Sequence, residues 1–229
     1  MKYLMTSAVA LVVAAPAAAQ TAGPVTSGVR VEGRVGWDKP EFKDKLVASD
    51  GSVLSRKSGK SGVSWGAEAG YDYVTNGKLL IGAYAGIAGS SAEDCPSAEF
   101  ICRDFGRNIT AGARVGYVLR RGVLYVKGGY SNGRVTETFD APPPPPGPVP
   151  PPPPGPVPPP PPAFERISNN YGGFHVGAGG EVMIGRNAYT KLEYVYTDYG
   201  KDKDVPVVGG DATFERKRHQ VLVGVGFRF

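Results

Sequence analysis

A serine between two glycines is the first feature of this chain that could do chemistry. Residues 62–66 read Gly-Val-Ser-Trp-Gly, which matches the Gly-x-Ser-x-Gly pattern of serine hydrolases. That pattern exposes its serine only on a sharp turn between a strand and a helix. Ser64 instead lies inside an alternating run over residues 61–74, which is typical of a strand. We therefore predict a small inward-facing residue there and not a nucleophile.

The two histidines are the other candidates for acid–base chemistry. His219 is in phase with the apolar residues of its strand, and its same-face neighbours Lys217 and Val221 are not nucleophiles. His175 has the opposite, inward phase, and we expect it to be hydrogen-bonded inside. The two histidines and two cysteines do not have the spacing of the usual Cys/His zinc site. The sequence predicts no catalytic residue, no metal and no cofactor.

Cys95 and Cys102 are the only cysteines, and they enclose Pro-Ser-Ala-Glu-Phe-Ile. Their spacing is not that of a Cys-x-x-Cys redox motif. In an exported protein we expect them to form one disulfide that closes a short loop. The alternative is two free thiols.

The chain alternates apolar and polar residues in eight segments, and the last is the clearest. Val221, Val223, Val225, Phe227 and Phe229 share one face of a strand that ends the chain. The eight expected strands cover residues 29–37, 61–74, 79–89, 108–118, 123–131, 171–184, 188–198 and 214–229. Short connections at 75–78, 119–122 and 185–187 alternate with long ones at 38–60, 90–107, 132–170 and 199–213.

Short turns that alternate with long loops are typical of outer-membrane barrels, whose short turns are periplasmic and whose long loops are extracellular. We predict an all-β fold, an eight-stranded antiparallel up-and-down transmembrane barrel. A soluble lipocalin-like barrel would point its apolar face inward around a ligand. Here the other face mixes charge with glycine, so we expect the apolar face to meet lipid and the bacterial outer membrane to be the location.

The inward face carries many charged residues. Unpaired buried charge is costly, and an eight-stranded lumen is just wide enough for side chains to fill. We therefore expect these residues to pair as a polar plug, with a small ion path as the alternative. The basic members are Arg30, Arg34, Arg114, Lys127, Lys191 and Arg228, and the acidic members are Glu32, Glu68, Asp72, Glu181 and Glu193.

The N-terminus has the features of a secretory signal peptide. A basic start is followed by an apolar run over residues 4–15 and by Ala17-Ala18-Ala19 before Gln20. The run is shorter than the ~20 residues that a membrane-spanning helix needs. We assign residues 1–19 to the signal and 20–229 to one barrel domain. Loss of Lys2 with the signal lowers the formal net charge from +5 to +4. This excess of positive charge is modest and scattered along the chain, which argues against nucleic acid as a partner.

A proline-rich insert interrupts the fifth connection. Residues 142–162 contain 17 prolines in 21 positions, and Pro-Pro-Pro-Pro-Pro-Gly-Pro-Val occurs twice. Proline lacks the N–H that a sheet ladder requires, so the segment should form an extended polyproline II rod with a rise of ~3.1 Å per residue. We expect an extracellular loop, which is either a tolerated expansion or an exposed stalk for a partner.

Three stretches together resemble the small eight-stranded outer-membrane barrels of the opacity-protein and porin-like (OmpA-like barrel) family. They are residues 177–181 (Gly-Ala-Gly-Gly-Glu), residues 191–200 (Lys-Leu-Glu-Tyr-Val-Tyr-Thr-Asp-Tyr-Gly) and the valine-rich strand that ends in Phe229. The resemblance covers residues 25–229 apart from the insert. It implies a non-enzymatic surface protein whose terminal aromatics, Phe227 and Phe229, are read by the barrel-assembly machinery.

Family members have varied roles, which include envelope integrity, adhesion and haem binding. Our first hypothesis is a structural and surface-interaction protein of the outer membrane. A minor pore or a ligand-binding protein, for haem as an example, is the alternative, and a lipid-modifying enzyme is the least favoured. The expected partners are outer-membrane lipid and lipopolysaccharide, the assembly machinery during biogenesis, and an extracellular partner of the loops.

Overall fold

The computed structural model describes residues 23–75, 78–95, 101–140, 164–207 and 210–229. The expected signal peptide and the proline-rich insert lie outside the described residues. In the part that is described, no helix has the length and apolar character needed to cross a membrane.

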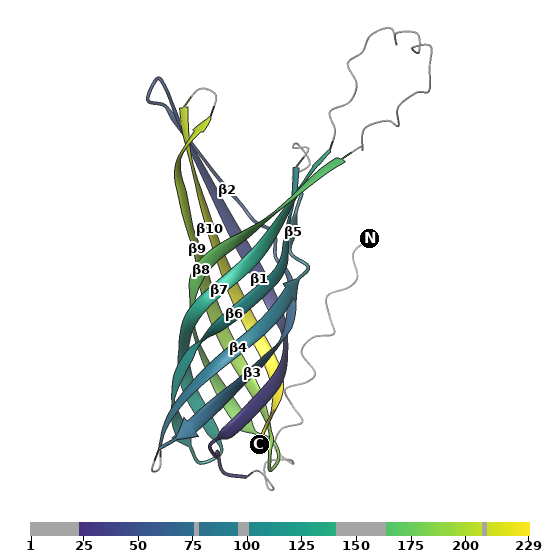
Figure 1. The fold of residues 1–229 in the computed structure, drawn as a ribbon, viewed down its shortest axis with the longest axis vertical. Helices are drawn as coiled ribbons and strands as arrows, with labels where there is room; N and C mark the ends of the chain where they lie inside the picture. Colours follow the sequence, from purple (N-terminus) through teal and green to yellow (C-terminus); the bar gives the residue numbers. More distant parts are fainter. Residues whose placement is uncertain (1–22, 76–77, 96–100, 141–163, 208–209) are drawn as a thin grey trace, which may run out of the picture.

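Eight long strands form a closed antiparallel ring, as the alternation predicts (Figure 1). Each pairs with its neighbour in the chain, and the first pairs with the last from Arg30 opposite Arg228 to Ala48 opposite Gly210. Closure leaves no strand edge exposed to lipid, where an unpaired backbone group would be costly. The strands are β1 (Gly28–Ala48), β3 (Gly62–Val74), β4 (Leu79–Ser90), β6 (Ile101–Leu119), β7 (Gly122–Asp140), β8 (Phe164–Met183), β9 (Ala188–Val207) and β10 (Gly210–Arg228).

Burial follows the two-residue period of the strands. In β1, Val29, Val31 and Val35 are exposed on the outer wall, whereas Arg30 and Glu32 are buried inside. Inward glycines make room for long side chains that cross the lumen. A Cβ at Gly112 would lie 2.8 Å from the hydroxyl oxygen of Tyr84. The barrel is therefore apolar outside and polar inside, as a barrel in lipid requires.

The expected loop lengths are wrong, because most strands continue well past the predicted ends. β1 runs to Ala48 and turns into β2 (Val53–Ser58), although we predict a connection over 38–60. The short β5 (Glu93–Asp94) and the first residues of β6 fall in the predicted 90–107 connection. Strand continues similarly through much of 132–170 and 199–213. Outward residues there are mostly charged or polar, for example Lys39, Glu41 and Arg134, so the regular apolar pattern stops while antiparallel pairing still satisfies the backbone.

The long strands separate into two arms above the ring (Figure 1). β8 pairs with β9 only from Phe174 opposite Asp198 to Met183 opposite Tyr189. Beyond that point β8 continues to pair with β7. On the other side β9 continues to pair with β10, and β10 pairs with β1. The C-terminus lies at the opposite end with the short turns (Figure 1). By the rule for outer-membrane barrels, we expect the arms to be extracellular.

Candidate functional site: a filled lumen below an outer vestibule

Glu68 lies at the centre of the lumen and accepts hydrogen bonds from three cations. Arg30 and Arg34 each approach a carboxylate oxygen to 2.7 Å, and Lys127 approaches to 2.8 Å. All four residues are buried. They come from β1, β3 and β7, so this carboxylate ties together opposite walls of the barrel.

A second cluster lies next to it around Arg114. Its guanidinium donates to both oxygens of Asp72, at 2.9 and 2.5 Å, and also bonds Glu181. Arg228 completes the group at 3.0 Å from Asp72 and 3.1 Å from Glu181. Two arginines thus face two carboxylates, which offsets much of the cost of burying the charges.

The third cluster contains Glu193, Lys191 and Glu32. Lys191 lies 3.2 Å from Glu193 and also forms an ion pair with Glu32. Glu193 forms a second ion pair with Lys127 at 3.1 Å. Glu32 reaches Arg30 at 3.1 Å, which links this cluster to the first. The structure therefore brings all eleven predicted lumen charges into connected ion pairs.

Tyrosines extend this network in a way that the sequence analysis missed. Tyr125 donates to Glu193 at 2.6 Å, and Tyr189 donates to Glu32 at 2.8 Å. Tyr84 lies 2.5 Å from Nε2 of His175, whose Nδ1 lies 2.9 Å from the hydroxyl of Ser131. The inward phase of Tyr84 and Tyr125 was a usable signal, but phase alone does not name a partner.

Asp38 and Arg218 form a separate layer above the charge network. Arg218 donates to both carboxylate oxygens of Asp38, at 2.8 and 2.7 Å, and both side chains are fully buried. The guanidinium carbon also lies 5.4 Å from the ring centroid of Phe105. Between the layers a cavity of about 10 Å³ has room for about one water molecule. Side chains therefore fill the barrel along most of its axis.

Above this layer lies an outer vestibule of about 180 Å³ between the arms. Arg103 crosses it with ion pairs to Glu137 at 3.1 Å and Asp44 at 3.4 Å. The guanidinium carbon of Arg216 lies 4.0 Å from the centroid of the Tyr171 ring, a close cation–π contact. Charged and aromatic side chains line the vestibule together.

The hydrolase-like serine is buried in the wall and faces inward, as predicted. Ser64 donates to the carbonyl of Gly89 at 3.1 Å and accepts from Gln220 at 3.0 Å. A nucleophilic serine needs a base within hydrogen-bond reach. His219 lies on the outer wall, where its Nδ1 is 2.8 Å from the hydroxyl of Tyr194. The geometry therefore does not join Ser64 to either histidine in a catalytic pair.

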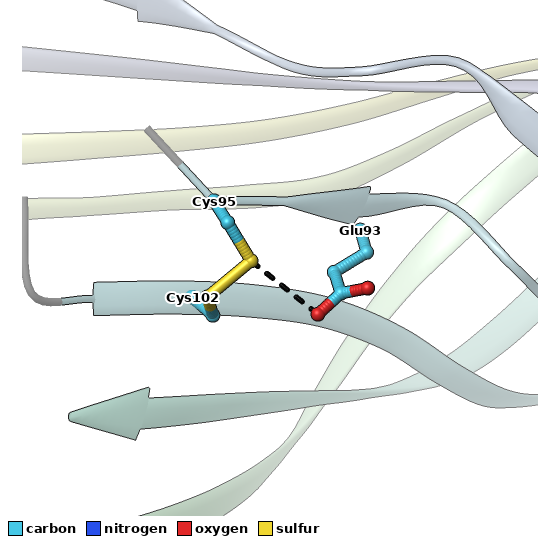
Figure 2. Close-up of side chains that lie close together, drawn as sticks. All are labelled: Glu93, Cys95 and Cys102. Carbon is cyan, nitrogen blue, oxygen red and sulfur yellow. Dashed lines mark hydrogen bonds between the residues drawn. A yellow bond between two sulfur atoms is a disulfide. The ribbon is translucent and has the colours of Figure 1, made fainter. Parts of the chain in front are cut away.

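The two cysteines form the expected disulfide at the extracellular end of β6 (Figure 2). An oxygen of Glu93 lies 3.3 Å from Sγ of Cys95. These three residues are close enough to resemble a metal site. A metal requires deprotonated thiols, however, and both sulfurs are committed to each other, so this cluster is structural.

The terminal aromatics point away from the lumen charges. Phe227 and Phe229 are exposed on the outer wall, and Arg228 between them is buried inside. The backbone N–H of Phe229 donates to the carbonyl of Val29 at 2.8 Å, so the terminus takes part in barrel closure. Their role as an assembly signal stays a prediction.

Comparisons with known proteins agree with this architecture. A family model described as the outer membrane protein beta-barrel domain matches residues 5–229. The 31 kDa outer-membrane immunogenic protein of Brucella melitensis biotype 1 is 28% identical over 245 residues, with 98% of this chain and 94% of that protein covered. A 22 kDa outer membrane protein of Rhizobium leguminosarum bv. viciae is 27% identical over 160 residues, with 70% and 63% covered.

Among solved structures, Neisserial surface protein A aligns at 17% identity with a TM-score of 0.45, and the match covers 89% of this chain and 98% of that chain. The expected membership in a small outer-membrane barrel family is confirmed by the family model. The chain belongs to the outer membrane protein beta-barrel domain family, and its location is the outer membrane of a Gram-negative bacterium.

Proposed function

We propose that this protein is a non-enzymatic outer-membrane protein that reinforces the envelope and presents an interaction surface outside the cell. The filled lumen carries the first part of the proposal. Eleven charged residues and two buried tyrosines link the barrel walls, so the interior acts as a structural core. Such a barrel adds a stable, closed element to the membrane and leaves transport to other proteins.

The extracellular arms carry the second part. They hold the outer vestibule, and the β1–β2 hairpin presents Val53 and Leu54 near its tip, with 57% and 70% of their surfaces exposed. Exposed apolar residues on a paired hairpin are suitable contacts for another macromolecule. A structural role alone does not require strands that continue so far beyond the ring.

Two strains separate the envelope role from the surface role. A deletion strain is complemented either with the wild type or with a short-arm variant, in which a four-residue Asn-Gly-containing turn replaces residues 45–56. We expect the deletion to increase entry of a large antibiotic such as vancomycin, and both genes to restore exclusion. Failure of the wild type to change entry would contradict the envelope role.

Binding tests the surface role in the same strains. Cells with wild-type protein should bind an immobilised host or environmental surface more than deletion cells do, whereas the short-arm variant should not restore binding. The variant must migrate differently before and after boiling on SDS gels, which shows that its barrel is folded. Equal binding by the short-arm and wild-type strains would contradict a role for this hairpin.

Ligand capture in the vestibule is a second candidate, because Arg103 and Arg216 line it beside Phe42 and Tyr171. Its volume of about 180 Å³ is below the ~300–1,000 Å³ of most small-molecule sites. It would hold one group of a larger ligand. Haem titration of wild type and of Arg216→Gln/Tyr171→Ala tests this: unchanged affinity would exclude the vestibule as the haem site.

A further inference from the structure

A basic rim covers the outer wall of one arm. Its lysines are outward-facing on β1, β2, β9 and β10, which are neighbours in the sheet. The register places Glu41 opposite Lys217, and Lys43 opposite both Glu215 and Lys57. The members of the basic rim are Lys39, Lys43, Lys45, Lys57, Lys201 and Lys217.

The rim keeps a surplus of positive charge after its own ion pairs are counted. Glu41 lies 3.0 Å from Lys57 and 3.7 Å from Lys39, and Glu215 lies 2.7 Å from Lys201 and 3.6 Å from Lys217. Hydrogen bonds from Lys57 and Lys201 lower the pKa of Glu41 and of Glu215, so both are ionised at neutral pH.

Asp211 and Asp198 are two further acidic residues on this face, and Asp211 is exposed opposite Val47. Asp198 accepts hydrogen bonds from the N–H of Gly200 at 2.9 Å and from the hydroxyl of Tyr196 at 3.3 Å. Among the described residues of this wall, six lysines thus face four carboxylates, and Lys43 and Lys45 are both exposed. The excess of cations favours a ligand with more than one negative charge.

The rim begins where the lipid-facing wall ends. Trp37 and Tyr194 are exposed on that wall, and each lies opposite Val221 in the register. Aromatic residues of this kind mark the membrane interface of a barrel. Lys39 is two residues past Trp37 and therefore ~7 Å further along the strand. The lysines therefore begin at the level of the lipid headgroups with Lys39, and Lys45 lies ~26 Å past Trp37 along the strand.

A groove in the adjacent wall offers a place for an acyl chain. It has a volume of about 430 Å³, and Trp65, Ile87 and Gly89 contribute to its lining with Arg107. Trp65 lies opposite Val35 of β1, so the groove is on the strands next to the basic rim. A headgroup-level basic surface beside an apolar groove fits a lipid better than it fits a free anion.

We propose that the basic rim binds the phosphate groups of lipopolysaccharide in the outer leaflet. Such binding would give the envelope role proposed above a physical basis, and its importance to the cell rests on that proposed role. The lysines neutralise phosphates that would otherwise repel one another, and the rigid sheet holds several of them at fixed spacing. Binding in vitro can fail without loss of the envelope role, so the two ideas fail separately.

The test compares two variants of equal charge change. The rim variant is Lys39→Gln/Lys43→Gln/Lys45→Gln/Lys217→Gln, which retains Lys57 and Lys201 so that Glu41 and Glu215 keep a partner. The control variant removes four cations at the other end of the barrel, and consists of Lys78→Gln/Arg120→Gln/Arg121→Gln/Arg186→Gln. Both are refolded at full length and checked for a shift on boiling in SDS gels.

Affinity is measured for vesicles that contain phosphorylated lipid A, and for vesicles with the same lipid A after its phosphates are removed. Wild type and control should bind the phosphorylated lipid alike, and the rim variant should bind it about tenfold or more weakly. Removal of the phosphates from lipid A should weaken binding of the wild type to a similar extent. Millimolar inorganic phosphate should not compete with the lipid for binding. The proposal is overturned if the rim variant binds as the control does, if dephosphorylation has no effect, or if free phosphate displaces the lipid.

Discussion

Arg218 and Asp38 are joined by two hydrogen bonds, of 2.8 and 2.7 Å, across the seam where the last strand meets the first. Both side chains have no exposed surface. The pair lies above the charge network and below the outer vestibule. It therefore joins the first strand to the last and also blocks the lumen at this level. Ser90 of β4 also donates to Asp38, which ties the pair to a third strand.

Loss of the Asp38 charge should strongly destabilise the barrel. Asp38→Asn leaves the Arg218 charge buried without a carboxylate, and breaking a buried pair in this way costs about 3–5 kcal/mol. The free energy of unfolding, measured by urea titration in detergent micelles, should fall by that amount. Lys201→Gln breaks an exposed pair with Glu215 and should cost less than about 1 kcal/mol.

A compensating variant distinguishes the charge from the packing. Asp38→Asn/Arg218→Met removes both charges, and such replacements are often neutral. It should recover most of the lost stability. If Asp38→Asn is no less stable than wild type, the pair does not stabilise the closed barrel.

The fold was predictable because the two-residue period needs only the identity of alternate residues. The same phase correctly places the lumen charges, for example Arg114 and Glu181, on the inside. The Asp38–Arg218 pair was missed because the predicted first strand ends at Trp37. Inward Asp38 and Phe42 continue the period, but their outward neighbours Lys39 and Glu41 are charged, so the apolar signal stops.

The individual pairings could not be predicted for a different reason. Arg114 and Glu181 are 67 residues apart, and their contact depends on the stagger of β6 and β8 across the lumen. Stagger is a property of the whole closed sheet and is not encoded in any one strand. The sequence predicts which residues share the interior, whereas only the structure shows which partners meet.

The disulfide should be present in protein isolated from the outer membrane. Peptides from unreduced protein should contain Cys95 linked to Cys102, as mass spectrometry can show. In the entropic model a loop this small contributes about 2–3 kcal/mol if the native geometry is unstrained. Cys95→Ser/Cys102→Ser should still assemble, since the bond lies above the ring. Alkylation of both native thiols without prior reduction would refute the bridge.

The terminal aromatic should matter for assembly more than for the finished barrel. Phe229→Ser should reduce the amount of protein in the outer-membrane fraction and leave unfolded protein in the periplasm. Phe174→Ser is the matched control, because Phe174 is also aromatic and exposed on the outer wall, at 56% of its surface. Equal assembly of the two variants would show that the terminus carries no special signal.

The proline-rich insert should be extracellular and dispensable for folding. β7 ends at Asp140 and β8 begins at Phe164, at the ends opposite the short turns. Deletion of residues 142–162 should leave the shift on boiling unchanged. An epitope placed in the insert should be labelled by antibody on intact cells. Labelling that requires a permeabilised outer membrane would reverse the topology.

Conductance across a planar bilayer tests the central claim, a lumen closed by ion pairs, most directly. Wild-type protein should give only rare and small events. Glu68→Ala/Lys127→Ala removes one charge of each sign from the centre and should increase conductance, whereas Glu41→Ala/Lys57→Ala removes the same charges from the outer wall and should not. Large, stable channels from the wild type, or no difference between the two variants, would contradict the claim.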